Sequence, residues 1–153
     1  MQRIKKQLKQ FFQIAVLSVL VTGCSTTHQI IDMVSDKPDY SQLYLRGSFT
    51  WWEADPQYQV QKYANNQYSV AVELVADGQP YEFKFADENW SPGLSCGYKA
   101  KESDEVLELG RVVDANCDTP VDNFKFTPPT SGKYLFIIDF SGWTSPEVKV
   151  VRI

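Results

Sequence analysis

Apolar and polar residues alternate along most of the chain beyond residue 42, and a period of two is typical of half-buried β-strands. Leu45 and Phe49 fall on one face of such a strand, while Arg46 and Ser48 fall on the other. The same alternation, or a short apolar run, predicts strands over residues 43–49, 68–74, 81–85, 107–109, 124–126, 133–140 and 147–153.

Two of these runs carry further information. Residues 133–140 are apolar on both faces, which predicts a central strand. In the last run the apolar face changes after Val150, which predicts a bulge.

Turn-forming dipeptides separate the runs: Asp55-Pro56, Asn65-Asn66, Asp77-Gly78, Pro92-Gly93, Pro128-Pro129 and Ser131-Gly132. No window of helical length shows a sustained apolar period of 3.6 residues. About seven or eight short strands with regular turns predict an all-β domain built as an antiparallel β-sandwich. A small antiparallel barrel is the alternative.

The N-terminus has the pattern of an export signal. Four basic residues and no acidic residue stand among the first nine, and an apolar stretch follows from residue 11 to 21. That stretch is shorter than the roughly 20 residues that a membrane-spanning helix needs, and it has the length of a signal-peptide core. The tetrapeptide Val21-Thr22-Gly23-Cys24 then resembles the lipobox of bacterial lipoproteins.

This resemblance implies that residues 1–23 are removed and that Cys24 carries acyl chains such as palmitate, which anchor the protein in a lipid bilayer. Two or three such chains hold a protein durably, whereas one binds marginally. Ser25 stands where Asp marks inner-membrane retention in the enterobacterial pattern, so we expect the outer membrane of the cell envelope. The alternative is an ordinary signal peptide with a chance cysteine. Residues 24–41 are predicted to be a lipidated tether, and residues 42–153 the domain.

Removal of the signal leaves an acidic chain, with 11 basic and 19 acidic residues and a formal net charge of −8. A nucleic-acid partner requires a basic footprint, so nucleic acid is not expected as a partner. Electrostatic attraction to anionic lipid is not expected either, and the acyl chains must provide the membrane anchor.

Cys96 and Cys117 are the two cysteines left once Cys24 is assigned to lipid. Export implies an oxidising compartment, in which a lone pair is expected to form a disulfide. A metal or redox site is the alternative, which the wide spacing and the lack of a nearby histidine disfavour.

Tryptophans stand in polar, turn-like stretches. Trp51 and Trp52 are adjacent and would face opposite ways on a strand, so at least one should be exposed or in a loop. Trp90 and Trp143 each follow a strand and lie among polar residues. An exposed indole can stack on the apolar face of a pyranose, so the pattern indicates a sugar-binding surface. The alternative is that each ring folds back over the edge of the core.

Residues 45–52, LRGSFTWW, resemble the Gly-Ser-Phe-Asn-x-Trp opening of starch- and glycogen-binding modules. These include the glycogen-binding domain of the AMP-activated kinase β-subunit and modules attached to bacterial pullulanases. Residues 81–91, YEFKFADENWS, resemble the later strand, lysine, turn and tryptophan of the same family, and residues 132–139 resemble closing strands of the pullulanase-type modules. The resemblance covers most of residues 43–151.

The resemblance implies an immunoglobulin-like sandwich that binds α-glucan or a related saccharide. Trp52 and Trp90 correspond to the family's two tryptophans and Lys84 to its lysine, and Trp51 stands beside them as a further candidate. Lys84 alternates with Phe83 and Phe85, so it should face solvent, either toward a ligand or paired with a neighbouring glutamate. Thr50 replaces the family's Asn, and the segment joining the two cysteines lies where a sugar would approach.

No catalytic machinery, metal or cofactor is expected. The folded region contains no histidine and no nucleophile elbow. Asp114, Asn116 and Asp118 are spaced like the start of a calcium loop, but Thr119 replaces the required glycine, so a solvated acidic loop is the preferred interpretation. The sequence therefore predicts a non-catalytic, saccharide-binding lipoprotein. The alternative is a structural or assembly lipoprotein that contacts another envelope protein and binds no sugar.

Overall fold

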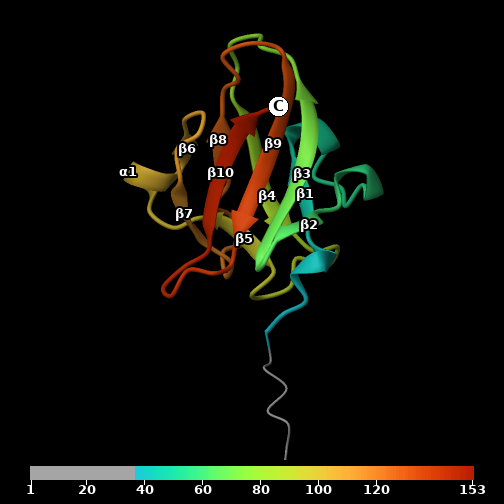
Figure 1. Ribbon diagram of the computed structural model, residues 1–153, viewed down its shortest axis with the longest axis vertical. Helices are drawn as coiled ribbons and strands as arrows, with labels where there is room; N and C mark the ends of the chain where they lie inside the picture. The colour runs from blue at the N-terminus through green and yellow to red at the C-terminus, as the bar shows by residue number, and fades with distance from the viewer. Residues whose placement is uncertain (1–36) are drawn as a thin grey trace, which may run out of the picture. The chain divides into compact units, whose positions relative to one another are not determined.

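The computed structural model describes residues 37–153, and every structural statement below concerns that part of the chain (Figure 1). The predicted signal peptide, the lipidation site at Cys24 and most of the tether lie outside these residues. The strands are β1 (Tyr44–Gly47), β2 (Gln61–Ala64), β3 (Gln67–Leu74), β4 (Tyr81–Ala86), β5 (Ser95–Tyr98), β6 (Val106–Leu107), β7 (Val113–Asn116), β8 (Phe124–Phe126), β9 (Gly132–Asp139) and β10 (Glu147–Arg152). The helical turns are η1 (Tyr40–Gln42), η2 (Ser48–Thr50), η3 (Pro56–Tyr58) and α1 (Lys101–Asp104), and no helix in this region is long and apolar enough to cross a membrane.

The strands form two layers that face each other. In the first layer β4 pairs with β1 on one side and with β5 and β8 on the other, and β6 extends the layer beside β8. The second layer has the order β2-β3-β9-β10-β7. Pairing of β5 with β7 joins the two layers into one ten-stranded sheet, in which β1 branches from β4. The predicted all-β sandwich is confirmed, although it has more strands than the seven or eight expected.

Aromatic side chains from the two layers meet in the core. Phe83 of β4 packs edge-on against Phe136 of β9, with ring centroids 4.9 Å apart. Phe126 of β8 packs in the same way against Tyr134 of β9 at 5.3 Å. These rings are fully buried because alternate residues of each strand point inward.

The central position of residues 133–140 is confirmed, since β9 lies between β3 and β10. The predicted bulge in the last strand is wrong. β10 keeps one register against β9 from Glu147 to Arg152, and Ile153 lies exposed beyond it. The irregularity occurs instead in β2, between Lys62 and Ala64.

A disulfide joins Cys96 of β5 to Cys117, as predicted. The residues that follow, the 117–122 loop, pack against β5 at Gly97, where a Cβ atom would collide with the carbonyl of Asp122. Glycine is therefore required for the close approach of the two backbones. This contact keeps the loop over the outward face of the first layer, which decides the environment of Lys84.

Candidate functional site

Arg46 joins the two loops that carry tryptophan. Its side chain leaves β1 on the outward face, yet only 5% of the residue is exposed. Nε donates a hydrogen bond to the carbonyl of Trp52 at 2.7 Å, and Nη1 donates to the carbonyls of Asp87 at 2.6 Å and Glu88 at 3.2 Å. The guanidinium carbon lies 3.6 Å from the centre of the Trp90 ring. One side chain thus connects Trp52 and Trp90, which are far apart in the sequence.

The charge of Arg46 is retained despite its burial. Burial lowers the pKa of the guanidinium from its ordinary value, and the carboxylates of Glu53, Asp87 and Glu88 act in the opposite direction. An arginine stays protonated under these conditions. A desolvated cation against an indole face stabilises by about 2 kcal/mol, so Arg46 holds the Trp90 ring in place.

The first tryptophan loop, which follows β1 and carries Trp51 and Trp52, is closed by Thr50. Its hydroxyl donates to the carbonyl of Gly47 and accepts from the amide of the same residue, at 3.1 and 3.0 Å. The amide of Trp52 also donates to the Gly47 carbonyl at 3.0 Å. Thr50 stands where the resembled family has Asn, and the hydroxyl satisfies the backbone groups of this turn.

The second tryptophan loop, between β4 and β5, is closed by Asp87. This buried carboxylate accepts from the amide and the hydroxyl of Ser91, at 2.7 and 2.6 Å. The backbone carbonyl of Asp87 accepts from Arg46. The same aspartate therefore shapes the loop and ties it to β1, which positions Trp90 between those two contacts.

All three tryptophans of these loops have left-handed backbones, with φ of 53° at Trp51, 63° at Trp52 and 56° at Trp90. Asn66 is the fourth non-glycine residue with positive φ in the described chain. Such a conformation is strained for a bulky side chain and costs about 1–3 kcal/mol per residue. Strain of this kind concentrates at ligand-binding sites, so its occurrence at these three residues makes their loops a candidate site.

The indole rings differ in exposure. Trp51 is 88% exposed, Trp52 is half-buried, and Trp90 is 38% exposed. Because Arg46 covers one face of the Trp90 ring, the accessible surface of that ring belongs to its other face and its edge. The prediction that at least one of Trp51 and Trp52 would be exposed in a loop is confirmed.

A polar hollow of about 130 Å³ adjoins the second tryptophan loop. It is lined by Gln42, Tyr44, Gln59, Asp87, Glu88 and Asn89. Tyr44 and Arg46 are two positions apart on β1 and therefore share its outward face. Amide, hydroxyl and carboxylate groups provide both donors and acceptors here, which is the chemistry that sugar hydroxyls require.

Lys84 is not part of the exposed surface, so the prediction that it faces solvent is wrong. The residue is 1% exposed, and its ammonium donates to the carbonyl of Thr119 at 2.6 Å. The cause is the 117–122 loop, which the disulfide and Gly97 hold over β4. Burial lowers the pKa of Lys84 to about 8, against the opposing effect of Asp122. In this conformation the ammonium is enclosed by protein.

No cluster of metal-binding side chains occurs within residues 37–153. The acidic stretch that resembles a calcium loop uses its oxygens internally. Asp118 accepts from the amide of Gly93 at 2.9 Å, and Asn116 accepts from the amide of Asp118 at 3.0 Å. Asp114 lies 3.5 Å from the ammonium of Lys99. The stretch is thus part of the loop framework.

Comparison with solved structures finds a match to one described as the ligand-induced structure of AmyP-SBD, a starch-binding domain. The alignment has a TM-score of 0.54 and 19% sequence identity, and covers 76% of this chain and 75% of that chain. The domain shares the fold of that starch-binding domain. No protein-family model matches the chain, and no curated protein matches its sequence. At this identity the fold is what the two proteins share.

Arg46 joins the loop of Trp51 and Trp52 to the loop of Trp90, whereas Lys84 lies beneath the 117–122 loop. Sequence reasoning missed Arg46, although a signal was present. Arg46 lies on the polar face of an alternating strand, immediately before the glycine that opens the first tryptophan loop. That position could have marked it as a residue that supports the loop.

Proposed function

We propose that this protein is a non-catalytic, lipid-anchored module that binds α-glucan or a related saccharide at the surface formed by Trp51, Trp52 and Trp90. The observation that carries the proposal is the joining of the two tryptophan loops by Arg46. The fold supports it, because a solved structure that shares this fold is a starch-binding domain.

Binding would use two kinds of contact. The free face of Trp90 and the exposed ring of Trp51 stack on the apolar faces of sugar rings, and the polar hollow beside Asn89 exchanges hydrogen bonds with their hydroxyls. Arg46 acts beneath the surface as a positioning residue, because it is too deeply buried to reach a ligand. Rings fixed in advance lose little conformational freedom on binding, which favours affinity.

The location is proposed from the sequence. Acyl chains on Cys24 would anchor the protein to a membrane of the cell envelope, with the outer membrane favoured by Ser25. Replacing Cys24 by serine should abolish lipidation, because the thiol that accepts the acyl group is lost. Labelled palmitate measures this directly, and incorporation into the Cys24→Ser protein would contradict the anchor.

The saccharide site is tested by electrophoresis in gels that contain amylopectin or glycogen. Wild-type protein should be retarded, and Trp52→Ala and Trp90→Ala should abolish retardation, since truncating a central aromatic anchor costs about 2 kcal/mol or more. Trp143→Ala should reduce retardation less, because Trp143 lies on a different turn. Thermal melting must show each variant folded.

The same gels separate the two function classes. If folded wild-type protein is not retarded by any α-glucan, the saccharide proposal fails. The exposed rings of Trp51 and Trp143 would then favour the alternative of an assembly lipoprotein that contacts another envelope protein.

A further inference from the structure

Trp143 lies in the turn between β9 and β10 and is fully exposed, at 103%. No aromatic or cation contact within the described residues involves its ring, in contrast to Trp90, which rests on Arg46. An indole exposed to this extent contributes little to the stability of the domain. Its substitution should therefore leave the fold intact, which makes it a clean site for a binding test.

A groove runs from this turn along the same end of the domain, where Figure 1 also shows the loop between β4 and β5. It consists of two adjoining hollows of about 300 and 420 Å³, which share Tyr40, Thr144, Ser145 and Pro146. Trp143 lines the first hollow. The second hollow reaches Lys99, Asp118 and Gly93.

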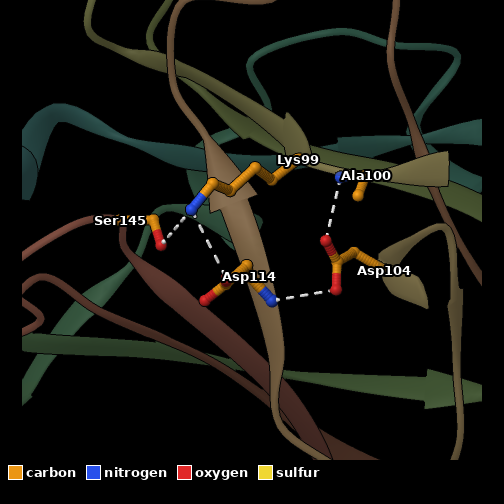
Figure 2. A network of polar contacts seen from close by, with 5 residues as sticks. All are labelled: Lys99, Ala100, Asp104, Asp114 and Ser145. Atoms are coloured by element: carbon orange, nitrogen blue, oxygen red, sulfur yellow. Dashed lines mark hydrogen bonds and ion pairs between the residues drawn. The ribbon is translucent and has the colours of Figure 1, made fainter.

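The polar groups of the groove are held by a defined network, shown in Figure 2. The ammonium of Lys99 lies 3.5 Å from the carboxylate of Asp114 and 3.2 Å from the hydroxyl of Ser145. Asp104 accepts from the amides of Ala100 and Asp114, at 2.8 and 3.4 Å. This network joins β5, β7 and the β9–β10 turn, so it fixes Lys99 and Ser145 relative to each other.

The chemistry of the groove fits a neutral, hydroxyl-rich chain. Lys99 donates, the carboxylate of Asp118 accepts and the hydroxyl of Ser145 does both, while Trp143 offers a flat apolar ring. The lining carries both positive and negative charge, at Lys99 and Asp118, which disfavours a strongly charged ligand.

The groove reaches the loop that carries the proposed saccharide-binding residue Trp90. Gly93, which lines it, belongs to the β4–β5 loop that carries Trp90, and the amide of Gly93 is bonded to Asp118 at 2.9 Å. A polysaccharide held at Trp90 can therefore bring a second stretch of glucan to Trp143. Two linked contacts raise the affinity for a polymer without changing the affinity for a short chain.

We infer that Trp143, together with Lys99 and Ser145, forms a second contact surface for the same α-glucan, used by polymeric chains and not required by short oligosaccharides. This inference rests on the proposed function at Trp52 and Trp90. It assigns to the exposed ring of Trp143 a role in retention on the polymer.

The test compares two ligands with the full-length protein purified in detergent. Maltotriose binding is measured by calorimetry, and amylopectin binding by gel retardation. Trp143→Ala should weaken amylopectin binding about tenfold and leave the maltotriose affinity unchanged within twofold. Lys99→Met should weaken amylopectin binding in the same direction, whereas Trp90→Ala should abolish binding of both ligands.

Tyr63→Ala is the matched control, because Tyr63 is an exposed aromatic residue, 57% accessible, on the edge strand β2 outside both surfaces. It should bind both ligands as the wild type does. Wild-type amylopectin affinity in Trp143→Ala, with Trp90→Ala inactive, would overturn this inference and leave the proposed function standing. Failure of the wild type to bind either ligand would instead overturn the proposed function, and this inference with it.

Discussion

Replacing Lys84 by methionine should change how the stability of the domain depends on pH. The ammonium is 1% exposed and donates to the carbonyl of Thr119 at 2.6 Å. Burial lowers its pKa from 10.5 to about 8, with Asp122 acting in the opposite direction. Methionine has a similar length and no charge. The Thr119 carbonyl keeps a second donor, the hydroxyl of Ser95 at 3.1 Å.

The magnitude follows from the two pKa values of Lys84. The folded-state pKa lies below the unfolded one, so the folded protein binds this proton less tightly and the charge opposes folding. The difference between the two pKa values corresponds to a destabilisation of the folded state by about 3 kcal/mol. This destabilisation is fully present below pH 8 and is relieved as the pH rises toward 10.5. Through this residue, the free energy of unfolding of the wild type should rise by about 2 kcal/mol between pH 7 and about pH 9.5.

Urea denaturation of wild type and Lys84→Met at those two pH values measures the effect. The upper value stays below the titration of Tyr40 and Tyr98, whose pKa values are raised, the first by burial and the second by its hydrogen bond with Asp122. The variant should lack the rise of about 2 kcal/mol, and at pH 7 it should be at least as stable as the wild type. It should also keep saccharide binding, since the ammonium is enclosed.

Three results would contradict this reasoning. An equal pH response of the two proteins would show that the Lys84 ammonium is not desolvated. A loss of several kcal/mol at pH 7 in Lys84→Met would show that the charge is a stabilising ion-pair partner. Loss of saccharide binding by a folded Lys84→Met protein would restore the direct sugar contact that the family resemblance implies.

Three further perturbations address the site and its support. Trp51→Gly should raise the free energy of unfolding by about 0.5–1 kcal/mol, because glycine relieves the left-handed strain of an exposed residue. The same change should weaken glucan binding. Lower stability in chemical denaturation would argue against strain at this position. Arg46→Lys should leave the domain folded but weaken glucan binding about tenfold, since lysine cannot make the forked contacts that hold Trp90. An unchanged affinity in calorimetry would show that Arg46 does not support the site. Replacing Cys96 and Cys117 together by alanine should lower the free energy of unfolding by about 3 kcal/mol, and unchanged urea denaturation would contradict that role of the bond.

Local signals in the sequence predicted the all-β class, the central strand at residues 133–140, the disulfide and the placement of tryptophans in turns. Each of these depends on a short period or on a residue type with one strong preference. The strands β2, β5 and β7 were missed, because none of them has large aliphatic or aromatic residues at two alternate positions.

The tertiary structure alone decided which outward-facing side chains reach solvent. The alternation in β1 and β4 places Arg46 and Lys84 on the same outward face, where they stand directly opposite each other in the strand pair. Both are nevertheless buried, Arg46 under Trp90 and Lys84 under the 117–122 loop. A period of two specifies the face of a strand but not what crosses above it. Segments remote in the sequence cover this face, so only the folded chain showed that Arg46 supports the candidate site and that Lys84 is enclosed.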